Sequence, residues 1–473
     1  MTAATASETL CRFAESLRFE DIPPEVVEKA KMLTLDLLGI SLAARADPID
    51  APLRAAARSF DGQGGGKIYT GPCSAVGETR KMPAASAAFL NAALGHSLDF
   101  DDTHTESIIH TAAPIVPPAL AAAEGFRRSG REMLCSMIAA FEGTIRIGLA
   151  APGAFHARGF HMTAIAGAFG AALAYGPMAS LSGRRLVSAL GICGSQAAGL
   201  FEYLEDGSPV KALHPGWAVH SGILATILAG GDFGGPSTVL EGRFGLFRSH
   251  LGSDPGEEPF NIAALTDGLG HRWETLATAY KPYPCGHVIH AFLDAAQTIR
   301  REEGFEAEKI ESIICHAAKG AIDLVLDPIE AKRRPRTSYE GKFSLPYCLG
   351  SIFVRGRCGV DEFTDKAVRE EGVLDVAGKV EYRLDDTQDF PRFLPGKIEV
   401  CLKGGKTLAA EEKHQRGCPE NPISTGDICE KFMDNARRSL RPSRAEEAMD
   451  IILRLEKLDR VDPLTAILRE AEK

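Results

Sequence analysis

Apolar residues recur every three to four positions along most of the first half of the chain, which is the spacing of an amphipathic helix. An opening helix is predicted at 22–44, where Pro23 and Pro24 stand in the first turn, the part of a helix that tolerates proline. Further segments share this spacing and are rich in alanine and glycine: 84–94, 112–126, 131–150, 163–179, 185–204 and 215–230. Because small residues let helices approach closely, these segments predict one large helical domain.

The period of the pattern shortens after about residue 268. Apolar and polar residues alternate as they do in strands in three segments: 310–315, 380–384 and 397–402. Gly404-Gly405 predicts a hairpin turn before a further strand at 407–409. Helical spacing is found again in 287–303, 340–354 and 424–458.

At 473 residues the chain is too long for one compact core, and the change of period indicates where it divides. We expect a mostly α protein with a helical domain over 1–268, completed by C-terminal helices in 420–473. A smaller α+β domain is expected over 269–419. A hydrophobic content of 45% is ample for two such cores.

The formal net charge is −10, so the composition does not favour nucleic acid or an anionic membrane as a partner. Residues 1–8 lack the basic and apolar regions of a signal peptide, and no strongly apolar run reaches the ~20 residues that span a bilayer. The eleven cysteines form no C-x-x-C pair, which disfavours zinc-ribbon, iron–sulfur and thioredoxin-like sites. Free thiols are the default in a reducing compartment, and we expect a cytoplasmic protein.

The stretch Gly95–His110 concentrates ionisable groups behind a predicted helix. Four carboxylates, three imidazoles and two threonine hydroxyls stand within its sixteen residues, and apolar residues separate Asp99 from Asp101 and Asp102. Apolar surroundings shift pKa values, and proton transfer depends on such shifts. A structural interpretation is the alternative, with Asp99 as a helix cap, the next two aspartates solvated and the histidines satisfied by hydrogen bonds.

Three further clusters carry candidate chemistry. His161 opens a predicted helix, where the positive end of the helix dipole lowers the pKa of a histidine. Lys211 and His214 are three residues apart and can share one helix face, and a lysine suits a substrate carboxylate. The turn Lys281–His287 stands at the apparent domain junction, a preferred place for ligands. Each has an ordinary alternative: a helix-start hydrogen bond, a surface lysine and a proline-stiffened connector.

A basic run from Lys332 to Lys342, which includes Arg336, is a candidate anion pocket, although such runs are more commonly solvated loops. Tyr347 on the following predicted helix is a candidate proton donor, and a packed tyrosine is the alternative. The spacing of the histidines in Gly95–His110 matches no metal-binding motif, so no metal site is predicted.

The segment from His96 to Thr103 resembles the signature of the MmgE/PrpD family, His-x-Leu/Met-Asp-Phe-Asp-Asp-Thr followed by a later histidine. Further likenesses follow in order along nearly the whole chain: Asp21–Gly39, Gly159–His161, Lys211–His214, Lys281–Cys285, Lys342–Ser344 and Gly417–Pro422. The resemblance implies a helical domain, an α+β lid domain and a cleft between them. It also implies a homodimer and an enzyme that needs no organic cofactor and no metal.

The resemblance further implies a set of catalytic residues, matched by position: Asp99, Thr103, His110, His161, Lys211 and Tyr347. The residues expected to bind substrate around them are His96, His104, His214, Lys281, His287 and Arg336. The implied reaction is proton transfer next to a carboxylate of a small di- or tricarboxylic acid. Lys211 would hold the carboxylate, Asp99 would orient an imidazole, and His110, His161 or Tyr347 would move the proton.

Dehydration of a 2-methylcitrate-like substrate is our first expectation for this lyase. The chain departs from the family pattern in three places: Thr111-Ala112 after His110, His104 after Thr103, and Gly286 in the Pro-Cys turn. These departures weaken an assignment to 2-methylcitrate or cis-aconitate specifically, and Thr111-Ala112 keeps an iminodisuccinate-type epimerase open as the alternative, beside a cis-aconitate-type decarboxylase. A catalytically silent binding homologue is the alternative from another class.

Overall fold

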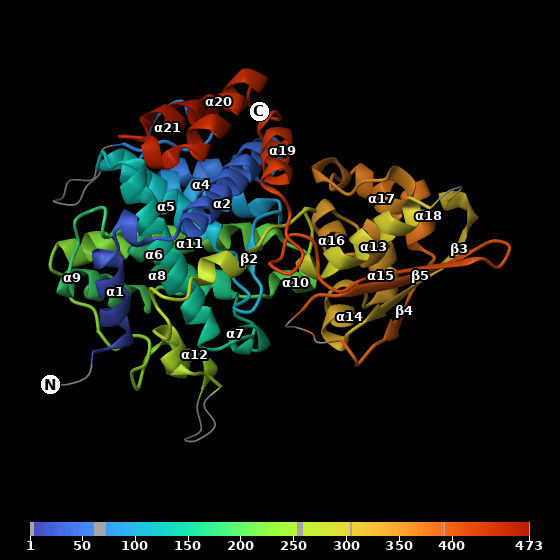
Figure 1. Ribbon diagram of the computed structural model, residues 1–473, viewed down its shortest axis with the longest axis horizontal. Coiled ribbons are helices and arrows are strands. Elements are labelled where there is room, and N and C mark those ends of the chain that lie inside the picture. The colour runs from blue at the N-terminus through green and yellow to red at the C-terminus, as the bar shows by residue number, and fades with distance from the viewer. Residues whose placement is uncertain are drawn as a thin grey trace.

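The computed structural model describes residues 4–60, 72–252, 259–302, 305–388, 390 and 393–472. These residues form a large helical domain and a smaller second domain beside it, which holds the main sheet (Figure 1). The protein is therefore mostly helical with a smaller α+β part, as the sequence pattern predicts.

The helical domain begins with the helices α1 (Ala6–Ser16), α2 (Pro24–Ala43), α3 (Asp50–Ser59), α4 (Ala84–Ser97), α5 (Ala112–Gly125) and α6 (Gly130–Leu149). It continues with α7 (Ala154–Ala157), α8 (Met162–Tyr175), α9 (Arg184–Cys193), α10 (Tyr203–Asp206), α11 (Leu213–Gly230) and α12 (Leu246–Leu251). Helix α8 is buried along its whole length and packs against α5, α6 and α11. A Cβ on Gly222 of α11 would lie 2.5 Å from the Ala168 carbonyl oxygen of α8, so this close approach requires glycine.

The second domain contains a four-stranded sheet in the order β4-β3-β5-β6. Its strands are β3 (Ile310–Ala317), β4 (Val380–Leu384), β5 (Gly396–Leu402) and β6 (Thr407–Glu412), and only the β3–β4 pair is parallel. Gly404 and Gly405 turn the predicted hairpin with φ values of +101° and +87°. The helices of this domain are α13 (His290–Arg300), α14 (Lys319–Val325), α15 (Ile329–Arg333), α16 (Ser338–Lys342), α17 (Leu345–Arg355) and α18 (Glu371–Ala377).

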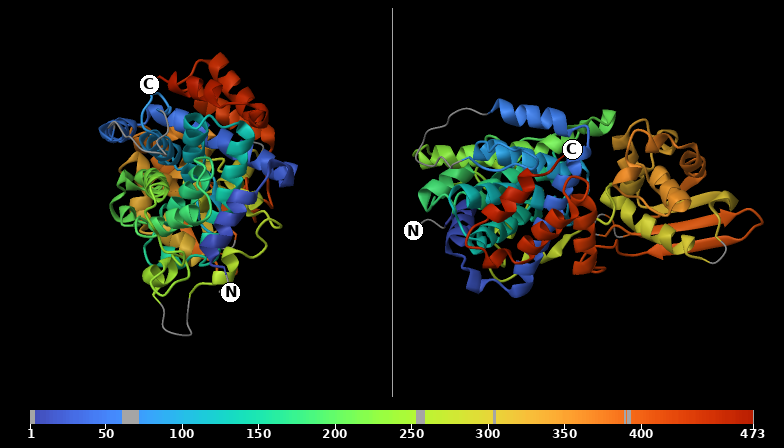
Figure 2. Two further views of the ribbon diagram at one scale, coloured as in Figure 1. Left: turned by 90° about the vertical axis from the view of Figure 1, so that its left-hand side faces the viewer. Right: turned by 90° about the horizontal axis from the view of Figure 1, so that it is seen from above.

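The C-terminal helices return to the helical domain. Helices α19 (Thr425–Ala436) and α20 (Pro442–Leu453) pack against α2, and α21 (Asp462–Arg469) packs against α20. All three are drawn in red at the top of Figure 1, and the view from above in Figure 2 keeps them on that domain. The buried apolar residues form two clusters, one shared by the helical domain and α19–α21 and one within the second domain. Each domain therefore has its own core.

Two predicted helices are interrupted, and both interruptions serve the cavity described below. The helix expected over 185–204 ends at Cys193, and Gly199 then adopts a φ of +151°, which only glycine adopts readily. The helix expected over 340–354 divides because Ser344 caps a new helix, its hydroxyl accepting a hydrogen bond from the Tyr347 amide at 3.0 Å. The chain can therefore change direction at both places.

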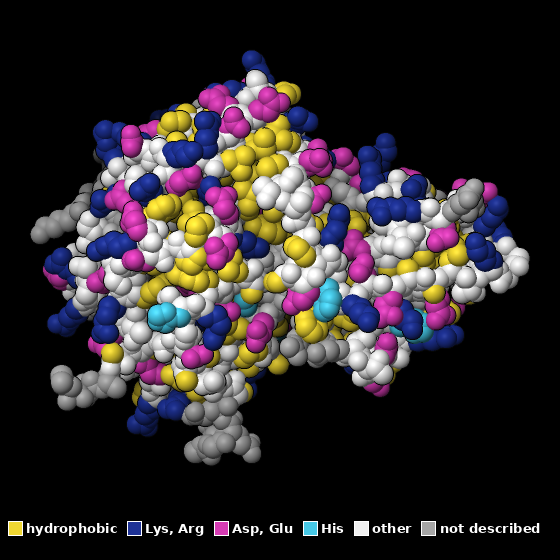
Figure 3. Space-filling view, in the orientation of Figure 1, with side chains coloured by type: hydrophobic (Ala, Val, Ile, Leu, Met, Phe, Trp, Pro, Cys, Tyr) yellow, Lys and Arg dark blue, Asp and Glu magenta, His cyan; other side chains and the backbone are white. Residues whose placement is uncertain are grey.

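Within the described residues, no helix combines the length and the apolar character needed to cross a bilayer. On the face drawn in Figure 3, Lys and Arg side chains are interspersed with Asp and Glu side chains over both domains. A two-stranded ladder joins β1 (Thr103–His104) to β2 (Thr278–Ala279), which ties the ionisable stretch 95–110 to the start of the connection between the domains.

Candidate active site

Asp99 lies in the turn that ends α4. Leu98 is the C-cap of the helix, and Asp99 follows with a φ of +54°, in the left-handed region that aspartate tolerates better than most residues. The turn carries the buried Asp99 carboxylate between two ammonium groups. Lys211 Nζ donates to Oδ1, and Lys281 Nζ donates to the same oxygen at 2.9 Å.

The charges around Asp99 are unequal. Burial alone would raise the pKa of Asp99, but Lys211 and Lys281 outweigh burial and hold that pKa well below its usual value. Burial also lowers the pKa of Lys211, and Asp99 opposes that shift. With both lysines protonated, one carboxylate faces two ammonium groups, which leaves one positive charge for a bound anion.

Three lysines from separate parts of the chain, of which Lys281 and Lys342 are buried and Lys431 is partly buried, hold the backbone of the same turn. Lys342 donates to the Leu98 carbonyl oxygen, Lys281 to that of Asp99 at 3.1 Å, and Lys431 to that of Phe100 at 2.9 Å. Lys342 ends α16 in the second domain, whereas Lys431 lies on the C-terminal helix α19. The position of the Asp99 carboxylate therefore depends on both domains and on the end of the chain.

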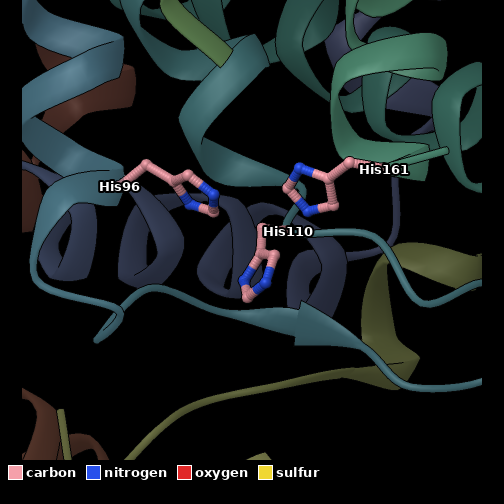
Figure 4. A group of neighbouring side chains, drawn as sticks. All are labelled: His96, His110 and His161. Carbon is pink, nitrogen blue, oxygen red and sulfur yellow. The ribbon is translucent and has the colours of Figure 1, made fainter. Parts of the chain in front are cut away.

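His96, His110 and His161 turn their rings toward one another (Figure 4). They come from α4, from the segment before α5 and from the N-cap of α8. The ring centres of His96 and His110 are 4.7 Å apart, those of His96 and His161 are 5.7 Å apart, and those of His110 and His161 are 6.1 Å apart. The end of α4, the segment before α5 and the N-cap of α8 thus bring three imidazoles into one cluster.

Each ring of this histidine cluster has a further partner at its Nδ1 atom. His96 Nδ1 is 2.7 Å from an Asp101 carboxylate oxygen, and His161 Nδ1 is 2.8 Å from Nδ1 of His214. His110 Nδ1 donates to the Asp102 carbonyl oxygen at 2.8 Å. These bonds fix the ring orientations, as second-layer partners of catalytic histidines do.

Burial keeps the imidazoles around the cavity neutral. Burial lowers the pKa of His110 and of His161 well below 6.5, and Lys211 adds to both shifts. Burial likewise lowers the pKa of His156 and of His214 to about 4. A bound anion would raise these pKa values again, so proton uptake can accompany substrate binding.

Asp101 and Asp102 are both buried, which makes the solvated interpretation wrong. Burial would raise the pKa of Asp101, but His96 and His110 outweigh it and lower that pKa. Asp102 accepts hydrogen bonds from the Thr111 amide, the Thr111 hydroxyl and the Ala112 amide at 2.6–3.0 Å, at the start of α5. Burial and the neighbouring Asp101 raise the pKa of Asp102 to about 7. Asp102 fastens the loop to α5, which is a structural role.

A cavity of about 410 Å³ opens beside Asp99 and the histidine cluster. Its ionisable and hydroxyl lining residues are Asp99, Thr103, Thr105, His110, His156, His161, Tyr203, Lys211, Lys281 and His287. Its larger apolar lining residues are Ile108, Phe201, Leu204, Val288, Leu324, Phe343, Phe390 and Leu394. Because residues of both domains line it, the cavity lies at their junction.

The structure brings most of the sequence-predicted residues to this cavity. Seven of them line it: Asp99, Thr103, His110, His161, Lys211, Lys281 and His287. His96 and His214 touch its lining histidines instead. The roles predicted for these residues remain predictions, and their common location makes them testable together.

The remaining three predicted residues belong to neither group. Tyr347 is buried in the core of the second domain, where its hydroxyl donates to the Glu362 carbonyl oxygen. Arg336 is exposed and pairs with Glu340 at 2.6 Å. His104 is buried beside Ser107, with 2.9 Å between His104 Nδ1 and the hydroxyl oxygen. Tyr347 is therefore a packed tyrosine rather than a proton donor at the cavity, because α17 directs its ring into the core of the second domain.

Several residues of the site escape sequence reasoning. His156, on the short helix α7, lines the cavity and stands only five residues before His161, which was the available signal. Lys431 is 331 residues away from Phe100 in sequence, and no local pattern could pair them. The apolar lining residues Phe201 and Phe390 read as ordinary core positions in the sequence.

The histidine cluster is also the group within the described residues whose geometry could hold a metal ion. One ring nitrogen from each of His96, His110 and His161 lies within 4.8 Å of the others. Lys211 and Lys281 oppose positive charge here, since they lower the pKa of His110. The same repulsion would weaken the binding of a dication.

Comparison with known proteins gives full-length matches. Residues 8–258 match the family model of the MmgE/PrpD N-terminal domain, and residues 283–457 match that of the MmgE/PrpD C-terminal domain. The chain is similar to a cis-aconitate decarboxylase of Aspergillus terreus, with 28% identity over 97% of this chain and 95% of the relative. It is also similar to the cis-aconitate decarboxylase of Homo sapiens, with 24% identity over 99% of this chain and 95% of the relative. A cis-aconitate decarboxylase-like protein of Aspergillus oryzae is 26% identical over 97% of this chain and 96% of the relative.

Proposed function

The chain belongs to the MmgE/PrpD family, and from the geometry of its cavity we propose that this lyase removes carbon dioxide from a small unsaturated carboxylic acid of the cis-aconitate type. The observation that carries the proposal is the pair of lysines on Asp99, beside neutral buried histidines. The similarity of the whole chain to three relatives named as cis-aconitate decarboxylases or decarboxylase-like supports loss of carbon dioxide over loss of water.

Lys211 and Lys281 supply the anchor for the carboxylate that the product keeps. The two ammonium groups exceed the single Asp99 carboxylate by one positive charge. That charge lies in a largely buried site, where electrostatic stabilisation of a developing anion is strong. When electrons move into the carbon chain, the negative charge develops next to the anchored carboxylate. The lysines therefore stabilise the enediolate-like transition state more than the substrate, which is the condition for catalysis.

The proton comes from a histidine. Substrate carboxylates raise the pKa of His110 and His161, so one of these rings is protonated in the complex. The carbon–carboxylate bond then breaks, and its electron pair forms a new double bond. The electron pair of the former double bond takes the proton from the imidazolium, and carbon dioxide leaves. Water reprotonates the imidazole in the next cycle, and no cofactor takes part in these steps.

The 2-methylcitrate-type dehydration expected from the sequence, the epimerase and the silent binding homologue are the competing assignments. Decarboxylation and these three assignments can all use the same anchor, and the three reactions among them differ in the bond that breaks. Proton NMR in deuterium oxide with cis-aconitate, 2-methylcitrate and iminodisuccinate separates them. We expect carbon dioxide release and one deuterium in the product from an unsaturated acid.

A matched pair of lysine variants controls this measurement. Lys211→Met removes the anchor, whereas Lys309→Met removes an exposed lysine that pairs with Glu306. Only Lys211→Met should lose decarboxylation. Water loss from 2-methylcitrate without carbon dioxide release would establish the hydro-lyase instead, and deuterium exchange with an unchanged carbon skeleton would establish the epimerase.

A further inference from the structure

We propose that the substrate carries an apolar alkyl arm and presents only the anchored and the departing carboxylates, as in an alkyl-substituted unsaturated dicarboxylic acid. This inference rests on the proposed function and specifies its substrate class. It departs from the tricarboxylate that the names of the relatives suggest, and the reason lies in the charge and the lining of the cavity.

The net charge of the side chains that line the cavity suits a substrate with few carboxylates. Among the described lining residues other than the histidines, the ionic groups are Asp99, Lys211 and Lys281, which sum to one positive charge when both lysines are protonated. This balances the carboxylate that stays, and the imidazolium that donates the proton balances the departing carboxylate. The departing carboxylate leaves as neutral carbon dioxide and gains from an apolar environment, because its charge disperses as the bond breaks. A third carboxylate would be desolvated with only neutral hydroxyl and imidazole donors, such as Tyr203 and His287, as partners, and a buried charge without a counter-ion is costly.

The basic run of the second domain does not supply a cation that could pair with a third carboxylate. The expectation that this run forms an anion pocket is therefore corrected. Lys332 Nζ donates to the carbonyl oxygens of Leu324 and Phe343, both at 2.9 Å, so it supports the backbone of two lining residues. Lys342 is buried on the Leu98 carbonyl, and Arg336 pairs with Glu340 at the surface. The run holds the cavity wall in place, and none of these three side chains is among the residues that line the cavity.

Apolar side chains fill the space around the anchor instead. Phe201 packs on His161 with 5.4 Å between ring centres, and the Lys211 ammonium lies 5.6 Å from the centre of the Phe343 ring. Leu204, Leu324, Phe390 and Leu394 extend this lining. An apolar arm on the carbon chain of the substrate would therefore contact aromatic rings and lose its hydration, with a gain that grows with its length.

The test is a chain-length series on one reacting skeleton. The compounds are cis-aconitate and glutaconates with hydrogen, methyl, butyl or hexyl at carbon 3, and the readout is kcat/KM for carbon dioxide release. We expect kcat/KM to rise about fourfold per methylene until the cavity is full, the value of one buried methylene. The butyl compound should exceed cis-aconitate. A flat series, or cis-aconitate above every alkyl compound, would overturn the inference.

Binding of unreactive analogues separates this inference from the proposed function. Calorimetry compares 3-hexylglutarate with tricarballylate, which has a third carboxylate in place of the alkyl arm. If no compound releases carbon dioxide and 3-hexylglutarate still binds more tightly, the decarboxylase assignment fails and the substrate class stands. If carbon dioxide is released and tricarballylate binds more tightly, the substrate class fails alone.

A wall variant and a matched control complete the test. Leu324→Arg adds a cation to the apolar lining, whereas Leu384→Arg adds one on β4, where the side chain is 53% exposed. Leu324→Arg should reduce the advantage of butylglutaconate over cis-aconitate at least tenfold, and Leu384→Arg should leave it unchanged. An equal effect of both variants, or none from Leu324→Arg, would contradict an apolar arm at this wall.

Discussion

The two domains contribute unlike halves to one cavity. The helical domain supplies the Thr103 hydroxyl and most of the ionisable groups: Asp99, His110, His156, His161 and Lys211. The second domain supplies an apolar wall with Val288, Leu324, Phe343, Phe390 and Leu394. Lys281 and His287 lie on the connection between them. In the proposed reaction, the chemistry would fall to groups of the helical domain and of the connection, whereas the second domain would add apolar contacts to those of Ile108, Phe201 and Leu204.

The two halves are nevertheless not independent. Lys342 reaches from the second domain to the Leu98 carbonyl, and Lys431 reaches from α19 to that of Phe100. With Lys281 of the connection on the Asp99 carbonyl, the turn that carries Asp99 is therefore held by lysines from three separate parts of the molecule. A variant can damage the chemistry through the anchor itself, through its support or through the stability of either core, and these effects have different sizes.

Loss of the anchor should have the largest effect. Lys211→Met leaves Asp99 bound to Lys281 and removes the excess positive charge from the helical half. We expect kcat/KM to fall by about 10²–10³-fold, as for the loss of one preorganised donor, with the circular dichroism spectrum unchanged. A loss of less than about tenfold in kcat/KM would show that the reaction does not depend on the Lys211 ammonium of the helical domain.

Loss of a support should act on both stability and turnover. Lys431 Nζ also lies 2.7 Å from the Asp36 carboxylate, which is buried, so Lys431→Met leaves that carboxylate unpaired. We expect about 3–5 kcal/mol lower free energy of unfolding. Denaturant titration measures this loss.

The double variant Lys431→Met with Asp36→Leu separates the two roles of Lys431. Its stability should recover because no charge remains unpaired, whereas kcat should stay about tenfold below that of the parent through the released Phe100 carbonyl, with KM little changed. Full recovery of kcat would assign Lys431 a structural role alone.

Acid should lower the stability of the helical domain, because burial lowers the pKa of its histidines. The unfolded chain protonates them near pH 6.5, whereas burial lowers the folded pKa of His104, His156 and His214 to about 4. Below pH 6.5 the unfolded state therefore binds more protons, and stability falls with pH down to about 4. Each such histidine costs about 1.4 kcal/mol per pH unit, and Asp102, with its pKa raised to about 7, offsets one of them in part.

The variant His104→Gln tests that account, since it removes one titrating ring outside the cavity. Urea unfolding at pH 7 and pH 5 should show a smaller loss of stability in acid for the variant than for the parent. Its kcat/KM should stay within about twofold of the parent value, because His104 does not line the cavity. A large fall in activity would return His104 to the substrate-binding residues predicted from the sequence.

The smallest effect on activity is expected from Tyr347→Phe. The hydroxyl donates to the Glu362 carbonyl within the second core, so its removal should cost about 1 kcal/mol of stability. Catalysis should change less than about twofold. A loss of kcat of a hundredfold with a normal fold would mean that Tyr347 turns toward the cavity during the reaction and that the second domain does take part in the chemistry.

The sequence by itself determined much of the architecture and part of the site. Helical and strand periods depend on neighbours three or four, or two, positions away, so α2, α8 and the β5–β6 hairpin follow from local pattern. The order of residues from His96 to Thr103 is likewise local, and it carried the family resemblance together with Asp99 and Thr103.

Only the tertiary structure decided what surrounds these residues. The contacts of Asp99 with Lys211 and Lys281 span 112 and 182 positions, and that of Phe100 with Lys431 spans 331. Such contacts depend on how two cores pack and leave no periodic trace in the chain. For the same reason, the packing of Tyr347 in the second core, the exposed position of Arg336 and the apolar wall of the cavity could not be read from the sequence.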